Sequence, residues 1–200
     1  MSDFYSSEEE KDIPSTSNYM KFLEGDNKFR ILGSFKEGTT IRGVVYWTTV
    51  DGKRMPKRLP VGAIVPVEEL ELNKFGEVDR PRFFWAFPVW NYQEKKVQIL
   101  EVTQTSVLNF IKKQIDNPKW GDPREYDFTV TRDDSSGKTV YTMTNDPKEE
   151  IDPAILKQYG ATRLNMKALF SGDDPFGEVE EQNTSTGGVE VAEVPEDIHE

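Results

Sequence analysis

Residues 41–53, IRGVVYWTTVDGK, decide the fold class of this chain. The first nine are rich in β-branched and aromatic side chains, which favour an extended strand. The pair Asp51-Gly52 follows, and Asp-Gly after such a run is a strong signal of a β-hairpin. The return segment, residues 53–59, is basic and contains Pro56, so we expect an edge strand or a loop arm there.

Strand patterns recur on both sides of this hairpin. A strand at residues 28–35 precedes it, and a short strand at 63–67 follows within a long connection. The most aromatic segment, RFFWAFPVWNY at 82–92, pairs back with a strand at 96–102. A second hairpin joins residues 126–132 to 138–143 around a turn at 133–137.

Two segments have helical periodicity. Residues 105–116 place Val107, Leu108 and Ile111 on one face, with Thr105 or Ser106 as N-cap, and Asn117-Pro118 ends the helix. Asp152-Pro153 begins a last helix that extends to about residue 170 and is weakened or split at Gly160.

The order of elements predicts a mainly β fold with minor α content. Five to seven strands carry one helix after the third major strand, a closing hairpin and a C-terminal helix. A small antiparallel β-barrel with a helix between strands 3 and 4 is the topology of an OB-fold. We therefore predict an OB-fold with an added C-terminal helix.

Charge divides the chain into three parts. The net charge is −11, from 36 acids and 25 bases. Five acids and one lysine lie in residues 1–17, and ten acids but no Lys or Arg lie in residues 172–200, which leaves 21 acids and 24 bases between them. We predict a flexible acidic N-terminus at 1–17, one domain at 18–171 and a disordered acidic tail at 172–200. The weakly basic domain is compatible with a polyanionic ligand.

Several site classes are disfavoured by composition. The chain has no cysteine, and its one histidine is His199 in the acidic tail. Thiolate metal sites, disulfides and the usual zinc ligands are thus missing from the domain, and we expect no metal and no cofactor. The N-terminus lacks a secretory pattern, and no apolar run approaches ~18 residues. We expect a soluble, cytoplasmic protein with no membrane partner.

The candidate site combines cations with aromatic rings, which is what binding of single-stranded nucleic acid requires. Alternation along residues 41–49 places Arg42 and Tyr46 on one face and Ile41, Val45 and Trp47 in the core. The hairpin arm adds four bases within six residues, namely Lys53, Arg54, Lys57 and Arg58.

In the aromatic strand the two faces differ in polarity. Phe83, Trp85, Phe87 and Val89 form the fully apolar face and are expected in the core. Arg82, Phe84 and Trp90 are then the exposed candidates, with Arg80 and Tyr92 at the ends of the strand.

Five segments carry a resemblance to a known family. They are YMKFLEGDNKFRIL (19–32), YWTTVDGKRMPKR (46–58), the hairpin 82–102, KWGDPREYDFTVTR (119–132) and GKTVYTM (137–143). In their order and spacing the chain resembles bacteriophage single-stranded-DNA-binding proteins and is similar in plan to the helix-destabilising protein of T-even-like phages.

The resemblance implies an OB-fold that coats single-stranded DNA in replication, recombination and repair, within the host cell's cytoplasm. It implies that the acidic tail recruits replication and recombination proteins. It assigns DNA binding to the arm 53–58, to Tyr46 and Trp47, and to the aromatics of 83–92. The T-even type has a zinc site and a basic N-terminal segment, both missing here. We therefore expect self-association along DNA, if it occurs, to use the helix 152–170.

Three other classes compete with this reading. A nuclease would need carboxylates such as Glu68, Glu69 and Glu71, Asp133 and Asp134, or Asp146, Glu149 and Glu150. These lie in expected loops and turns, and no phosphate-binding glycine loop or nucleophile motif accompanies them, so we expect no enzyme. A DNA mimic needs carboxylates fixed on the folded surface, whereas the surplus acids lie at the ends. An OB-type protein adaptor would leave the arm's bases without a role.

Overall fold

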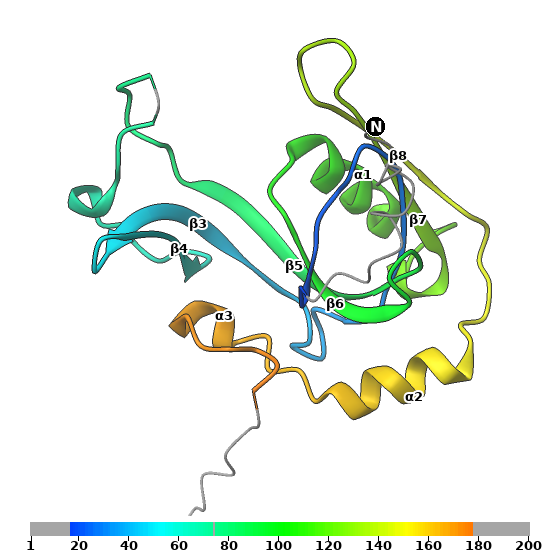
Figure 1. Ribbon diagram of the computed structural model, residues 1–200. Helices are drawn as coiled ribbons and strands as arrows, with labels where there is room; N and C mark the ends of the chain where they lie inside the picture. Colours follow the sequence, from blue (N-terminus) through cyan, green and yellow to red (C-terminus); the bar gives the residue numbers. More distant parts are fainter. Residues whose placement is uncertain (1–16, 74, 178–200) are drawn as a thin grey trace, which may run out of the picture.

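The computed structural model describes residues 17–73 and 75–177, and their fold is mainly β, as the sequence predicts (Figure 1). One mixed sheet contains eight strands. The strands are β1 (Tyr19–Met20), β2 (Gly25–Ile31), β3 (Ile41–Val50), β4 (Lys53–Pro60), β5 (Arg82–Asn91), β6 (Lys96–Val102), β7 (Asp127–Asp133) and β8 (Val140–Asn145).

Within residues 17–73 and 75–177, five helical segments accompany the sheet. They are the 3-10 turns η2 (Val67–Glu69) and η3 (Pro123–Glu125) and the α-helices α1 (Thr105–Asp116), α2 (Pro153–Thr162) and α3 (Ala168–Ser171). In the part of the chain that the structure describes, no helix has the length and apolar character needed to cross a membrane.

The long strand β5 organises the sheet. One of its edges pairs with β6, from Trp85↔Val102 to Asn91↔Lys96. The other edge is shared, because β3 pairs with its first half and β2 with its second half. The path of strands is β1-β6-β5-β2-β7-β8, and the pair β1–β6 is the parallel one. Among the described strands β1 and β8 do not pair with each other, so the sheet is open and the predicted closed barrel is not found.

The β3–β4 hairpin projects from the body of the protein as an arm (Figure 1). Its turn residues Asp51 and Gly52 have φ values of 51° and 76°, as a tight hairpin turn of this kind requires. Strand β4 pairs with β3 alone, and it tolerates Pro56 because an edge strand has one row of N–H groups without a ladder partner. The predictions of an Asp-Gly hairpin and of an edge strand are confirmed.

Both faces of β5 are buried, which explains its nearly continuous apolar sequence. Trp85, Phe87 and Val89 pack into the largest apolar cluster, together with the apolar face of α1. Phe84 and Ala86 point into a second cluster, which α3 covers through Leu169. A third, smaller cluster lies under α2.

The helices follow the sequence signals with small shifts. Helix α1 has the predicted bounds, but its N-cap is Gln104 rather than Thr105 or Ser106. Helix α2 begins at Asp152-Pro153 as predicted, and Asp152 caps it by accepting a hydrogen bond from the Ala154 N–H at 2.8 Å. The predicted helix 152–170 is interrupted after Thr162, where Arg163 takes a left-handed φ of 47°, and not at Gly160.

Two further sequence predictions can be placed. The expected strand at 63–67 does not form, and that part of the connection contains η2 instead. The predicted flexible N-terminus and disordered tail fall largely on residues 1–16 and 178–200, which lie outside the described residues.

Candidate nucleic-acid interface

A groove lies where the base of the arm meets α1. It has a volume of about 770 Å³ and is formed by β3, β5, the end of β6 and α1. Its lining residues are Arg42, Pro81, Arg82, Phe83, Trp85, Thr103, Thr105, Leu108, Asn109 and Lys112.

The groove is electropositive. Arg42, Arg82 and Lys112 line it, and none of the described lining residues carries a carboxylate. The nearest acid to Arg82 is Asp79, whose carboxylate lies 3.9 Å from the guanidinium. Thr105 is the first residue of α1, and the N–H groups of a helix's first turn carry partial positive charge. The arrangement favours an extended anion such as a phosphodiester chain.

Aromatic rings accompany these cations. The Phe83 side chain is 44% exposed, whereas Trp85 is 8% exposed and forms part of the wall. Phe35 stands edge-on to Trp85 with ring centroids 5.2 Å apart, and the Arg42 guanidinium lies 5.8 Å from the Phe35 centroid. An exposed ring beside cations has the geometry of a platform on which a base can stack.

Strand register brings these side chains together. Arg42 is the cross-strand partner of Trp85, and Val44 is the partner of Phe83. Directly opposed residues of an antiparallel pair point to the same face, so Arg42, Trp85 and Phe83 share one surface. The expected exposure of Arg42 and Arg82 is confirmed. Arg80 is also exposed and lines an adjoining cavity together with Arg82.

The four bases of the arm are present but differ in their surroundings. Arg54 pairs with Glu71 at 3.0 Å and with Asp79 at 2.9 Å. Lys57 pairs with Glu69 at 2.8 Å, and Arg58 pairs with Glu101 at 2.5 Å. Lys53 is exposed and makes no ion pair with the described residues. Intramolecular carboxylates therefore neutralise most of the arm's charge.

The predicted orientations of Tyr46 and Trp47 are wrong. Tyr46 is 1% exposed, and Trp47, expected in the core, is 39% exposed with Arg54 5.0 Å from its ring centroid. Alternation fails because β3 pairs with β5 only as far as Val45 and continues with β4 as its sole neighbour. Beyond that point a different segment covers the strand. The Tyr46 hydroxyl donates to Glu69 at 2.8 Å, and burial together with this bond raises the pKa of Tyr46 to about 12.

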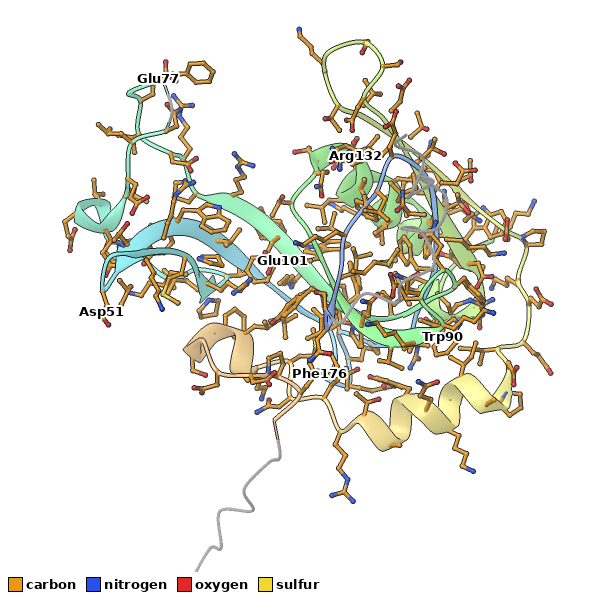
Figure 2. All side chains as sticks on the ribbon, viewed as in Figure 1. Asp51, Glu77, Trp90, Glu101, Arg132 and Phe176 are labelled. Carbon is orange, nitrogen blue, oxygen red and sulfur yellow. The ribbon has the colours of Figure 1, made fainter. Side chains whose placement is uncertain are left out.

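The predicted exposure of Phe84 is also wrong. Its side chain is fully buried, with the Phe170 ring 6.4 Å away, because α3 covers the face of β5 that the sequence left open. Phe83 on the opposite face is exposed instead, since the apolar cluster under α1 begins at Trp85. Trp90 is half-buried beside α2, on the far side of the body from Asp51 at the tip of the arm (Figure 2).

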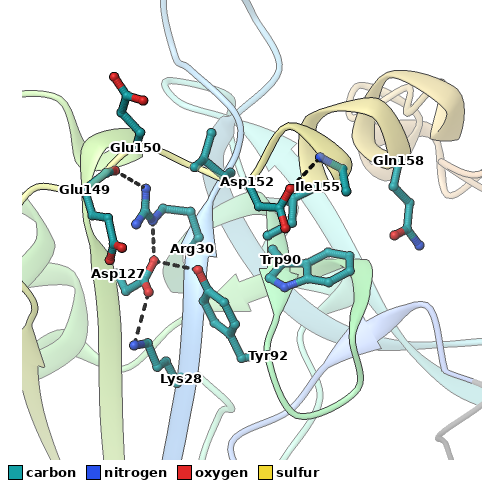
Figure 3. A pocket seen from close by; sticks show the side chains of 12 residues that line it. Lys28, Arg30, Trp90, Tyr92, Asp127, Glu149, Glu150, Asp152, Ile155 and Gln158 are labelled. Carbon is teal, nitrogen blue, oxygen red and sulfur yellow. Dashed lines mark hydrogen bonds and ion pairs between the residues drawn. The ribbon is translucent and has the colours of Figure 1, made fainter.

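Trp90 and Tyr92 line a separate cavity of about 470 Å³ beneath α2 (Figure 3). Asp127 lies at its centre and accepts hydrogen bonds from Arg30 and from the Tyr92 hydroxyl, the latter at 2.9 Å. Burial and the Asp127 bond raise the pKa of Tyr92 to about 12. The carboxylates that line this cavity are Asp127, Glu149, Glu150 and Asp152. Four carboxylates disfavour phosphate, so we interpret this network as structural.

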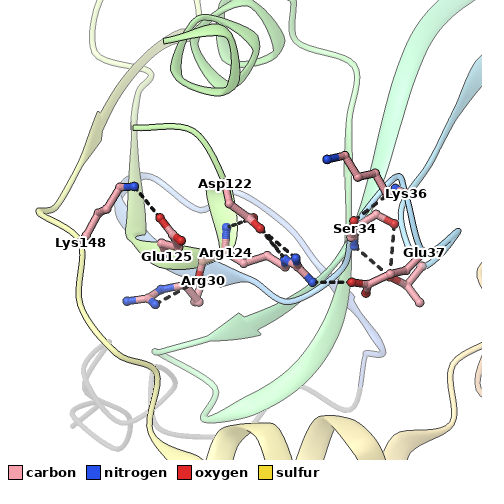
Figure 4. A network of polar contacts seen from close by, with 9 residues as sticks. Arg30, Ser34, Lys36, Glu37, Asp122, Arg124, Glu125 and Lys148 are labelled. Atoms are coloured by element: carbon pink, nitrogen blue, oxygen red, sulfur yellow. Dashed lines mark hydrogen bonds and ion pairs between the residues drawn. The ribbon is translucent and has the colours of Figure 1, made fainter. Parts of the chain in front are cut away.

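A second polar network ties η3 to the turn at residues 34–39 (Figure 4). Arg124 pairs with Asp122 at 2.8 Å and with Glu37 at 2.9 Å. The Arg124 guanidinium holds the pKa of Asp122 below its usual value. These charges satisfy one another and fix the chain between α1 and β7.

Two of the carboxylates that a nuclease could use, Asp133 and Asp134, have local partners. Asp133 accepts from the Ser135 N–H at 2.8 Å, and Asp134 accepts from the Thr139 hydroxyl at 2.7 Å, so both shape the β7–β8 turn. Within residues 17–73 and 75–177, no three His, Cys, Asp or Glu side chains gather in a way that could hold a metal ion.

Sequence reasoning missed three contributors to the groove. Phe83 was assigned to the core, and Lys112 and the N-terminus of α1 were not considered. Lys112 was identifiable as a polar position of an amphipathic helix, but only the tertiary contact between α1 and β5 places it beside Arg82.

No protein-family model matches the chain, and no curated protein sequence matches it significantly.

Proposed function

We propose that this protein binds and coats single-stranded DNA without sequence preference, as a phage protein of replication, recombination and repair would. One observation carries the proposal. A groove without a lining carboxylate gathers Arg42, Arg82 and Lys112 beside the exposed ring of Phe83.

The mechanism follows from the chemistry of the groove. The three cations neutralise successive phosphates and release counterions from the strand, which makes affinity depend on salt. Phe83 stacks on a base, and stacking contributes ~1–3 kcal/mol per base whatever its identity. Bases in a duplex already stack on each other, so a ring that needs an unstacked base favours single strands. None of these roles requires catalysis or a cofactor.

The chain order supports an OB-type ancestry as part of this proposal. The correspondence takes β2 and β3 together as the first strand and leaves β4 out as an addition. In that case β5 and β6 are the second and third strands, α1 follows them, and β7 and β8 are the fourth and fifth strands. Strand β2 pairs with both β5 and β7, as a first strand shared between two neighbours would. OB-folds are partly open and bind oligonucleotides on the face of their second and third strands. The groove is lined by the first half of β5 and by Thr103, the residue that follows β6, and β5 and β6 take those positions.

The C-terminal region completes the proposal. We propose that the acidic tail 172–200 recruits replication and recombination proteins in the host cytoplasm, and that the 152–170 region serves any self-association along DNA. The exposed pair Asp173 and Asp174 begins this tail. Helix α3, which precedes them, lies beside β4 (Figure 1). The tail therefore starts close to the basic arm.

The experiment that tests this function is a titration of oligo-dT into the protein at several salt concentrations, followed by tryptophan fluorescence. Trp85 lies in the wall of the groove and serves as the reporter. We expect saturable binding at low salt, a weaker response to duplex of equal length, and affinity that falls with salt at a log–log slope of about −0.7 per phosphate neutralised. No binding at low salt would refute the function.

A further inference from the structure

Two bases of the arm, Arg54 and Lys57, are paired with carboxylates from the connection between β4 and β5. We call residues 66–72 together with Asp79 the acidic strap. Glu69 receives two hydrogen bonds from the Lys57 ammonium, at 2.8 and 3.0 Å. Glu71 accepts from Arg54 Nε at 3.0 Å and also from the Thr49 hydroxyl. These carboxylates occupy the hydrogen-bond donors of Arg54 and Lys57 that face the strap.

The strap connects the arm to the groove. Asp79 accepts from Arg54 at 2.9 Å and lies 3.9 Å from Arg82. Arg82 lines the groove. The cations of the arm and of the groove therefore form one continuous path, and Asp79 occupies the point where its two parts meet.

Two apolar side chains of the strap contribute little to its attachment. Val67 is 76% exposed and Leu72 is 64% exposed, so these side chains face solvent rather than the arm. The strap also contacts the arm through ion pairs, whose cationic side chains are about half exposed, 52% for Arg54 and 47% for Lys57. Exposed pairs contribute ~0–1 kcal/mol each and weaken as salt rises. An attachment of this kind is open to competition by another polyanion.

A buried ring lies under the strap. Tyr46 is 1% exposed, belongs to none of the three apolar clusters and donates its hydroxyl proton to Glu69. Its cross-strand partner is Lys57, which contacts the same carboxylate. If Glu69 moves away, the Lys57 ammonium loses its carboxylate partner and the neighbouring Tyr46 ring is uncovered at the same time.

We infer, on the basis of the proposed DNA binding, that the acidic strap is a built-in competitor for the phosphates of single-stranded DNA. In the free protein its carboxylates occupy Arg54 and Lys57. A single strand that has entered the groove displaces them, and the bound path then extends along the arm to Tyr46. The arm thus becomes available only to a ligand already seated in the groove.

The first test compares two double variants of equal net charge. Glu69→Gln with Glu71→Gln removes the ion pair of Lys57 and one of the two ion pairs of Arg54, leaves the Arg54–Asp79 pair in place, and keeps the side-chain shapes. Glu68→Gln with Glu77→Gln is the matched control, because both residues are exposed and form no ion pair with the described residues. We expect the strap variant to bind oligo-dT about 3- to 10-fold more tightly at low salt, with a slope steeper by ~0.7, because Lys57 is freed while Arg54 keeps its pair with Asp79. The control should stay within about 2-fold of the wild type, as expected for charges without a fixed partner. Equal affinity and slope in both variants would overturn the inference.

The second test needs no variant. Hydrogen exchange of the Glu69 and Leu70 amides, which bond to Pro66 and Val67 carbonyls, reports on the strap in the wild-type protein. We expect their exchange to accelerate when saturating oligo-dT is added. Unchanged or slower exchange in a protein that does bind oligo-dT would refute the strap while leaving the DNA-binding function intact. Failure of the wild type to bind would refute the function itself.

Discussion

Removal of the three groove cations is the most direct perturbation of the proposed interface. The variant replaces Arg42, Arg82 and Lys112 with Ala. All three side chains are exposed, and the closest carboxylate contact of Arg82 is the 3.9 Å approach to Asp79. Surface substitutions of this kind usually change stability by no more than about 0.5 kcal/mol each. The variant should therefore fold, and its binding can be measured directly.

The expected loss can be estimated from counterion release. Each phosphate neutralised on a single strand contributes about 0.7 to the log–log salt slope, so three lost contacts should flatten the slope by about 2. Between 1 M and ~0.1 M salt, a slope difference of about 2 corresponds to about two log units of affinity. At ~0.1 M salt the variant should therefore bind oligo-dT roughly 100-fold more weakly than the wild type. At high salt the variant and the wild type should converge.

The assay is the oligo-dT titration at a series of salt concentrations. The matched control replaces Lys21, Lys36 and Lys138 with Ala, which removes the same charge from exposed positions outside the groove and outside the 152–170 region. The control should keep most of the slope. If the groove variant and the control lose affinity equally, net charge rather than the groove determines binding, and the proposed interface is wrong.

Three further predictions separate binding from stability. Phe83→Ala should weaken oligo-dT binding by ~1–3 kcal/mol with little effect on folding. Phe84→Ala should instead lower the free energy of unfolding, measured in urea, by ~3–5 kcal/mol because the Phe84 ring is fully buried. The reverse pattern would show that Phe84 faces the ligand and Phe83 the core. The buried Tyr126 hydroxyl has no hydrogen-bond partner among the described residues, and burial raises the pKa of Tyr126 to about 12. The folded state therefore favours the neutral phenol. This contribution to stability is fully present below pH ~10 and is lost as the pH rises toward 12. Tyr126→Phe should leave stability unchanged or higher at pH 7 and reduce the alkaline loss, and a marked drop in urea midpoint at pH 7 would contradict this. Asp127→Asn should lower the free energy of unfolding by ~3–5 kcal/mol, because the charge of Arg30 is then buried without a carboxylate partner; the Arg30 side chain is 2% exposed. A change below about 1 kcal/mol would show that the backbone carbonyls bound to Arg30 are enough to stabilise its charge.

Local patterns were enough to predict most elements. These elements depend on residues close in sequence: the Asp51-Gly52 turn, the edge strand with Pro56, the bounds of α1 and the start of α2 at Asp152-Pro153. The exposure of Arg42 and Arg82 is also predictable from residue type, because a charged side chain on a strand is rarely buried without a charged partner. The segment 63–67 failed because its apolar residues resemble a strand but have no partner strand to pair with.

The faces of the strands were harder to predict. A period of two shows which residues share a face but not what covers each face. At Phe84 the cover is α3, which lies more than eighty residues further along the chain, and at Tyr46 it is Glu69 from the strap. The alternation along β3 changes phase after Val45 because its neighbour on one edge ends there. No local signal marks that end.

The sequence by itself determined the mainly β class, the arm, the cations and the supply of rings, because each of these depends on residue type and near-neighbour spacing. The tertiary structure alone decided which rings are exposed, which bases are already paired, and that α1 brings Lys112 to the groove. The physical reason is that burial and ion pairing depend on segments far apart in the sequence. The arm illustrates the difference, because its four bases are evident from the sequence, whereas the carboxylates that pair with Arg54, Lys57 and Arg58 are evident only in the fold.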